Sequence, residues 1–233
     1  MEKADRIHSG SRQAIMTAIR EQLASSEPFN SVHEENRARH EAVGLSGKLP
    51  VEQSTSLLER FQQSLNAVGG HCTVVRSEAE ATETVRQIVA QSKTRRVAIS
   101  DSPLVGRVLL PLTADVDLMK GSTKADLFTC DMGVTGAQWA IAETGTLALE
   151  SDVERHRLAS LVPPVHVTII EAQRIRQTLG EVLLAIDEKG RDLSRTITFI
   201  TGPSRTSDIE LTLAIGVHGP AELHVIVLEE TKG

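Results

Sequence analysis

A turn rich in hydroxyl and amide groups follows a predicted buried strand near the C-terminus. The chain turns at a Gly-Pro pair and is predicted to enter a helix over 207–217, with Ser207 or Asp208 as its cap. The free N–H groups of a first helical turn, hydroxyls and a guanidinium are groups that hold a carboxylate or a phosphate. The segment therefore predicts either an anion site or plain helix capping. Alternatively, Asp208 and Glu210 could orient Arg205, and the arginine would then have a structural role.

Glycines and threonines surround one carboxylate, Glu143, in the middle of the chain, in the runs 131–137 and 142–146. Glycine lets the backbone approach a ligand closely or adopt a positive φ. Burial among apolar neighbours could raise the pKa of Glu143 and equip it for proton transfer or nucleophilic attack. The alternative is a tight turn in which Glu143 caps backbone N–H groups. The sequence contains neither a GxxxxGK[ST] loop nor a GxGxxG strand-to-helix turn.

Arg155, His156 and Arg157 end a charged run that could receive an anionic substrate or the acidic surface of a partner. A charged run after a strand is more often a solvated loop, so both interpretations stay open. His166 lies in the apolar run 165–170. A lone histidine in such a run is more often a hydrogen-bonded core residue than a base or a ligand.

Strands and helices are predicted to alternate from residue 51 onwards. Helices or helical turns are predicted over 51–68, 77–89, 105–110, 137–142 and 207–217. Strands are predicted over 72–75, 96–99, 116–119, 127–130, 146–150, 165–170, 196–200 and 223–228. Nearly all-apolar strands that alternate with helices imply an α/β fold with a mostly parallel central sheet flanked by helices. Ligands of such sheets bind beyond the carboxyl ends of the strands.

The first 50 residues differ from the rest of the chain. Apolar residues at helical spacing predict a short amphipathic helix over 11–23. Proline and glycine among charged residues indicate an extended arm over 25–50. We therefore predict an N-terminal helix and arm, 1–50, and a main domain, 51–233. An isolated short helix is marginal in water, so this one either packs on the main domain or another subunit, or belongs to a solvated tail.

The composition excludes several classes of function. The net charge is -6, the pI is about 5.8 and aromatic residues make up 2% of the chain. These values disfavour nucleic-acid binding, which relies on basic surfaces and stacking rings. Cys72 and Cys130 lie far apart and belong to no metal-ligand pattern. With no apolar run long enough for a membrane span, we expect a cytoplasmic protein that binds no metal or cluster of its own.

Three runs resemble the lactate utilization protein C family, whose shared unit is the LUD domain. They are Asp131–Leu147, Arg157–His166 and Ile200–Leu213, the last with Gly216–Pro220. The resemblance covers about residues 70 to 230, and the first 50 residues match only loosely. It implies a fold like that of ribose-5-phosphate isomerase and the CoA transferases. It also implies a role in a bacterial three-component system that oxidises L-lactate to pyruvate, whose sister subunits carry the iron-sulfur clusters.

The resemblance predicts a subunit of this system that binds a small carboxylate or assists the cluster-bearing subunits. Oxidation of a hydroxy acid needs an electron acceptor, and this chain offers none, so we expect no cofactor here. Two alternatives remain: a stand-alone isomerase- or CoA-transferase-like enzyme with Glu143 as base or nucleophile, and a non-catalytic scaffold whose N-terminal helix docks a partner. The expected site comprises Glu143 as the catalytic residue and, for binding, Thr135, Gly136, Thr144, Gly145, Thr146, Ser204, Arg205 and Thr206.

Overall fold

The structure is a computed structural model that describes residues 17–18, 21, 56–120, 123–152, 157–188, 194–207, 213–216 and 218–229. The chain divides into two compact units, Met1–Ser54 and Thr55–Gly233, and the fold described below is that of the second. Of the helix predicted over 11–23, only Thr17, Ala18 and Glu21 are described, and all three are helical. The predicted arm over 25–50 lies outside the described residues.

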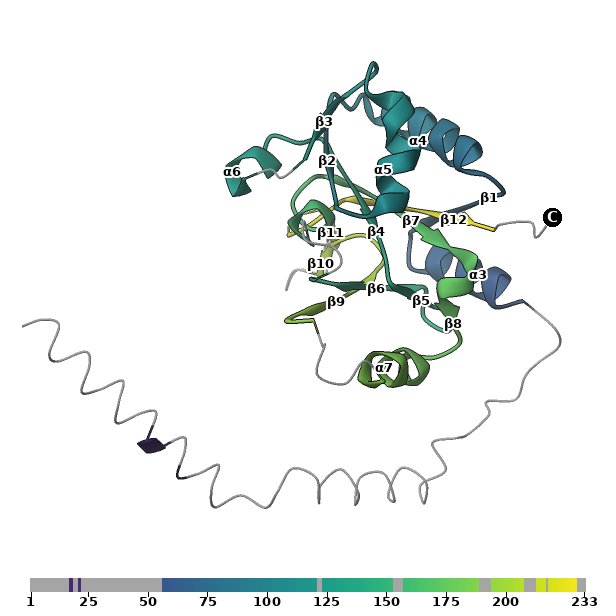
Figure 1. Ribbon diagram of the computed structural model, residues 1–233, viewed down its shortest axis with the longest axis vertical. Coiled ribbons are helices and arrows are strands. Elements are labelled where there is room, and N and C mark those ends of the chain that lie inside the picture. The colour runs from purple at the N-terminus through teal and green to yellow at the C-terminus, as the bar shows by residue number, and fades with distance from the viewer. Residues whose placement is uncertain are drawn as a thin grey trace, which may run out of the picture. The chain divides into compact units, whose positions relative to one another are not determined.

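The main sheet has six strands, all parallel, in the order β1-β12-β7-β4-β2-β3 (Figure 1). Two of its inner strands, β7 and β12, are mostly apolar, as expected for strands whose two faces are both covered. This arrangement confirms the predicted α/β class. The bounds are β1 (His71–Val75), β2 (Arg96–Ile99), β3 (Asp117–Met119), β4 (Met132–Gly136), β7 (Val165–Glu171) and β12 (Glu222–Leu228).

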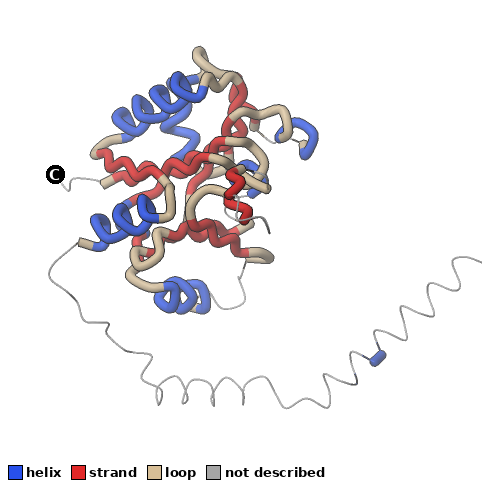
Figure 2. Tube along the Cα trace, turned by 180° about the vertical axis from the view of Figure 1, so that it is seen from behind, coloured by secondary structure: helices blue, strands red, loops and turns tan. Residues whose placement is uncertain are grey.

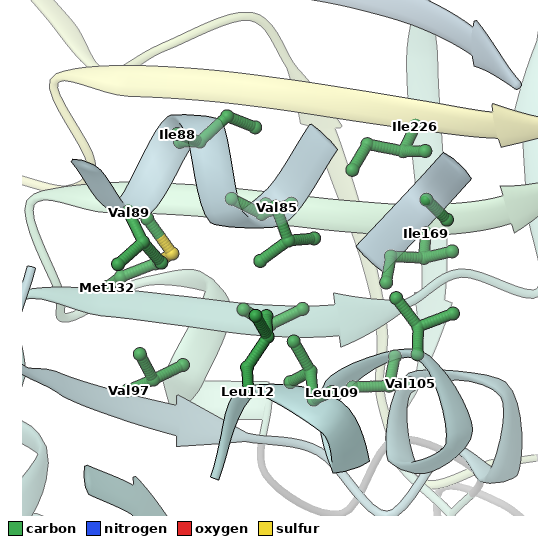
Figure 3. Packing of buried hydrophobic residues seen from close by; sticks show 14 of the residues in the cluster. Val85, Ile88, Val89, Val97, Val105, Leu109, Leu112, Met132, Ile169 and Ile226 are labelled. Atoms are coloured by element: carbon green, nitrogen blue, oxygen red, sulfur yellow. The ribbon is translucent and has the colours of Figure 1, made fainter. Parts of the chain in front are cut away.

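Two helices, α4 (Glu78–Ser92) and α5 (Pro103–Leu109), cover one face of the main sheet (Figures 1 and 3). Val85 of α4 and Leu109 of α5 are buried in the same apolar cluster as Met132 of β4. The Ser77 hydroxyl accepts a hydrogen bond from the backbone N–H of Glu80, which confirms the predicted cap of α4.

The helix α3 (Leu57–Ala67) and a second sheet cover the other face (Figure 1). Leu65 of α3, Leu147 of the second sheet and Val225 of β12 are all buried in one apolar cluster. The second sheet has the order β8-β5-β6-β9, in which β6 pairs antiparallel with both of its neighbours. Its strands are β5 (Trp139–Ile141), β6 (Thr146–Glu150), β8 (Ile175–Arg176) and β9 (Ile197–Thr201).

The outer face of the second sheet carries α7 (Leu179–Asp187) (Figures 1 and 2). Val182 and Ile186 of this helix are buried against Trp139, Ile141 and Ala148. The described domain is therefore layered: α4 and α5, the main sheet, the second sheet with α3, and α7. In the described part of the chain, no helix is long and apolar enough to cross a bilayer.

Three predicted elements are wrong. The predicted strand over 127–130 is the end of the short helix α6 (Lys124–Leu127) and a turn, and the predicted helical turn over 137–142 contains β5. The predicted helix over 207–217 is wrong at its described residues, which belong to an antiparallel pair, β10 (Arg205–Ser207) and β11 (Leu213–Ile215), or follow it, while residues 208–212 and 217 lie outside the described residues. Short apolar runs fit either period, so tertiary pairing decided between helix and strand.

Candidate functional site

Two of the predicted ligand segments lie side by side at one edge of the second sheet. Thr146, the first residue of β6, is paired in register with Thr201, the last residue of β9, and with Ile141, the last residue of β5. The turn that joins β5 to β6, residues 142–145, therefore adjoins the turn that leaves β9. Thr146 and Thr201 are more than 50 residues apart in the sequence, and the antiparallel pairing of β6 with both of its neighbours brings the two turns together.

Three threonine hydroxyls connect the two turns, and we call them the hydroxyl chain. The Thr144 and Thr146 hydroxyl oxygens are 2.7 Å apart, and those of Thr146 and Thr201 are also 2.7 Å apart. Thr146 is buried, whereas Thr144 and Thr201 are exposed. Three hydroxyls carry three protons, and the two bonds within the chain use two of them. One O–H therefore remains for a further acceptor, and it is that of Thr144 or Thr201 whenever Thr146 donates to one of its two neighbours.

Both turns press against the C-terminal end of α3, and each does so through a glycine with positive φ. Gly145 has φ +66, and a Cβ there would lie 2.5 Å from Leu65 Cα. Gly202 has φ +72, and a Cβ there would lie 2.6 Å from the Val68 carbonyl oxygen. The close backbone approach predicted for Gly145 is thus made to a helix of the same chain, and Gly202 makes a similar approach.

Arg205 adjoins the same end of α3. Its Nη2 donates to the Val68 carbonyl oxygen over 2.6 Å, and its side chain is exposed. A cation is favoured at a helix C-terminus, where the last carbonyls lack partners. The described residues show no helix start beside Arg205, since Arg205, Thr206 and Ser207 form β10, and residues 208–212 lie outside the described residues. Asp208 and Glu210, the predicted partners of Arg205, lie outside the described residues.

Glu143 makes contacts on three sides of its turn. Its Oε1 accepts from the backbone N–H of Leu179, the first residue of α7, over 3.0 Å. Its own N–H donates to the Gln177 carbonyl, and its carbonyl accepts from the Ser64 hydroxyl. The carboxylate thus serves a helix N-terminus, where a negative charge is favoured. This contact corresponds to the capping alternative, while a catalytic role of Glu143 stays a prediction.

Thr135 lies inside the main sheet rather than on a loop. It is fully buried on β4, and its hydroxyl is 2.9 Å from His166 Nε2, which is also 3.1 Å from the Thr168 hydroxyl. Burial lowers the pKa of His166 to about 3, so the imidazole is neutral at physiological pH. Its Nδ1 is buried with no hydrogen-bond partner among the described residues. His166 is therefore the hydrogen-bonded core residue that the sequence predicted.

The other predicted site residues lie on a strand, in a turn or outside the described residues. Gly136 ends β4 and pairs with Ile169 of the main sheet. Two backbone hydrogen bonds hold Ser204 in its turn: its N–H donates to the Pro220 carbonyl, and its carbonyl accepts from the N–H of Gly216. Thr206 lies on β10, and its side chain is outside the described residues. Arg155 and His156 also lie outside them.

The site therefore consists of the hydroxyl chain and Arg205, which both border the end of α3. Sequence reasoning missed Thr201 because it looked for ligand groups after the strand and not at its last residue. It also missed Thr168, although the i, i+2 spacing from His166 along a strand places both side chains on one face. Neither residue belongs to a recognisable motif, so the pairing of strands was needed to find them.

Metal or thiol chemistry has little support among the described residues. No group of three or more His, Cys, Asp and Glu side chains is arranged there to hold a metal ion. Burial raises the pKa of the Cys72 thiol to about 11, and burial also raises the pKa of Cys130. Both thiols are therefore protonated and unreactive near neutral pH.

Comparison with known proteins gives a family match over most of the described domain. The family model of the LUD domain matches residues 58–228. A Deinococcus radiodurans protein named lactate utilization protein C is 37% identical over 133 residues, which cover 52% of this chain and 62% of the relative. An Exiguobacterium protein of the same name is 28% identical over 184 residues, covering 75% of this chain and 78% of the relative.

Other relatives extend the comparison to structure. An uncharacterized protein of Neisseria meningitidis is 32% identical over 152 residues, covering 65% of this chain and 64% of the relative. The alignments with this protein and with the Deinococcus relative thus span less than two thirds of each relative's length. A crystal structure of a DUF162 family protein from Deinococcus radiodurans matches with a TM-score of 0.59 and 27% identity, covering 75% of this chain and 99% of that one.

Proposed function

The chain belongs to the LUD domain family, and on this premise we propose that it serves in lactate utilization by binding a small carboxylate such as L-lactate or pyruvate. The observation that carries the proposal is its similarity to proteins named lactate utilization protein C in several bacteria. The binding role rests on the geometry at the end of α3.

The hydroxyl chain and Arg205 have the chemistry that a small carboxylate needs. When the Thr146 hydroxyl donates to one neighbour and accepts from the other, the hydroxyl chain keeps one O–H, on exposed Thr144 or Thr201, for an outside acceptor. The guanidinium of Arg205 has five N–H donors, of which one is used on the Val68 carbonyl. A carboxylate that accepts from both groups would add charge-assisted bonds, which are stronger than neutral ones.

Electron transfer is assigned in this proposal to iron-sulfur partners. Oxidation of L-lactate to pyruvate releases two electrons and needs an acceptor. An iron-sulfur cluster is held by about four cysteine thiolates, and this sequence contains two cysteines in all. The chain would then present or release the carboxylate while a cluster-bearing protein receives the electrons.

Calorimetric titration of the full chain with L-lactate and with pyruvate tests the binding role. The double variant Thr144→Val and Thr201→Val removes two hydroxyls and keeps the side-chain shape, so affinity should fall by about tenfold or more. Thr73→Val is the matched control, because Thr73 is an exposed strand threonine on β1, away from the site. Equal affinities in the parent and the double variant would remove the carboxylate site.

Growth on L-lactate tests the broader role separately. A strain that lacks the gene should grow poorly on L-lactate as sole carbon source, and the full chain supplied on a plasmid should restore growth. Normal growth of the deletion strain on L-lactate would refute a role in lactate utilization even if the purified protein bound a carboxylate.

A further inference from the structure

Glu143 stands between the two helices that border the turn of residues 142–145. Its carbonyl oxygen accepts from the Ser64 hydroxyl of α3 over 3.4 Å, and its carboxylate oxygen Oε1 accepts from the backbone N–H of Leu179 in α7 over 3.0 Å. Gly145, two residues on, presses against the backbone of α3. The turn is therefore held by α3 on one side and by the start of α7 on the other.

The exposed residue in the middle of this turn is Thr144, which belongs to the hydroxyl chain. Two backbone hydrogen bonds continue the parallel pairing of β5 with β8 into the turn, as far as the N–H of Glu143. The Thr144 hydroxyl then has to reach that of Thr146 over 2.7 Å. Because Thr144 directly follows Glu143, the contact of the Glu143 carboxylate with α7 helps to set the direction in which the Thr144 side chain leaves the backbone.

The start of α7 receives side-chain acceptors from two places. The Thr178 hydroxyl accepts from the N–H of Glu181 within the same helix, whereas Glu143 accepts from the N–H of Leu179 across to another element. Both contacts satisfy N–H groups of the first helical turn, and both therefore stabilise α7. Of the two, only the contact of Glu143 connects the helix to the turn that carries Thr144.

We propose that Glu143 is a positioning residue of the carboxylate site, which holds Thr144 in the hydroxyl chain by bonding the start of α7. The inference rests on the proposed function and adds how the affinity of that site is set. A helix N-terminus favours the negative charge of Glu143, so this charge is engaged away from an anionic ligand. Positioning requires only a hydrogen-bond acceptor at residue 143, whereas a base or a nucleophile requires the carboxylate itself.

Calorimetric titration of three full-chain variants with L-lactate and with pyruvate separates these roles. Glu143→Ala removes the acceptor, so the affinity should fall by about fivefold or more. Glu143→Gln keeps an amide oxygen as acceptor, so its affinity should stay within about twofold of the parent's. Thr178→Ala is the matched control, because it removes an acceptor inside α7: it should lower the Tm and leave the affinity unchanged.

Three results of the titration would overturn the proposal. Glu143→Ala could bind as tightly as the parent, in which case the contact with α7 does not affect the site. Glu143→Gln could lose as much affinity as Glu143→Ala, which would indicate that the carboxylate itself acts on the ligand. Thr178→Ala could lose as much affinity as Glu143→Ala, which would reduce the role of Glu143 to the stability of α7.

The methyl signals of labelled threonines in NMR spectra report on the hydroxyl chain without any ligand. In Glu143→Ala the signals of Thr146 and Thr201 should shift, although neither residue adjoins position 143 in the sequence, and Glu143→Gln and Thr178→Ala should leave them in place. Unmoved signals of Thr146 and Thr201 in Glu143→Ala would overturn the positioning role. If the parent bound neither carboxylate, the proposed function would fail, while these signals would still decide whether Glu143 holds the hydroxyl chain.

Discussion

Replacing Gly133 with alanine is expected to destabilise the protein by about 3 kcal/mol, through a contact between two distant segments. Gly133 lies on β4, where the turn Arg157–Ser160 crosses the sheet. A Cβ at this position would lie 2.7 Å from the carbonyl carbon of Ala159 and closer still to its oxygen, whereas real Cβ atoms essentially never come within 3.0 Å of a non-bonded heavy atom of a distant residue.

The cost should lie at the upper end of the range for overpacking, because a backbone carbonyl cannot rotate away as a side chain does. Overpacked cores typically lose about 1–3 kcal/mol, and each kcal/mol lowers the Tm of a chain of this size by roughly 2–4 °C. The Tm of Gly133→Ala should therefore fall by roughly 6–12 °C. Urea denaturation followed by circular dichroism gives the free energy of unfolding directly.

Gly106→Ala is the matched control with the opposite expected sign. Gly106 lies inside α5, and a Cβ there would meet no atom within 4 Å. Alanine is favoured over glycine inside a helix by about 0.5–1 kcal/mol, so this variant should be more stable than the parent. If the urea midpoint of unfolding were the same for Gly133→Ala and the parent, the close contact between β4 and Ala159 would be refuted.

Three further predictions concern stability. Burial lowers the pKa of His166 to about 3, below its usual value of about 6.5, so the unfolded chain takes up the proton first as the pH falls. The free energy of unfolding should therefore fall between about pH 6.5 and 3, by at most about 1.4 kcal/mol per pH unit. Urea titrations of His166→Asn should show a shallower decline with falling pH than those of the parent. Arg205→Ala removes the hydrogen bond to the Val68 carbonyl and should lower the free energy of unfolding by about 1 kcal/mol, whereas Arg205→Lys should lower it less. An unchanged Tm in both variants would argue against a stabilising contact between Arg205 and Val68. Ser56→Ala removes the capping box that Ser56 and Glu59 form at the start of α3, so the free energy of unfolding should fall by about 1 kcal/mol. Ser102→Ala at α5 should lower it much less, because the Ser102 side chain makes no capping bond. Similar decreases in the two variants would contradict the assigned caps.

Most of the parallel sheet could be predicted, and its inner strands β7 and β12 most directly, because they are buried on both faces. Apolar runs such as 165–170 and 223–228 can be satisfied only inside a covered sheet, and both are central strands. Helix ends were also readable: Ser77 caps α4, and Gly69, with φ +84, follows the end of α3. These features depend on local propensity and periodicity, which sequence records directly.

The strand β4 shows why other elements could not be predicted. Its residues Met132–Gly136 contain two glycines and a threonine, which read as a loop, yet all five are buried. Gly133 has room for no side chain because the Ala159 carbonyl lies over it. A glycine required by a contact with a residue 26 positions away looks the same in sequence as a glycine required by a turn.

The candidate site, too, was predictable from the sequence only in part. Sequence alone identified the family and the two turns, because ordered runs of residues and Gly-Thr clusters are local patterns. Only the tertiary structure decided that Thr201 joins Thr144 and Thr146, that Arg205 binds the end of α3 and that Thr135 faces His166 in the core. Each of these contacts joins residues that the chain itself keeps apart, so strand pairing and layer packing, rather than local propensity, bring them within hydrogen-bond distance.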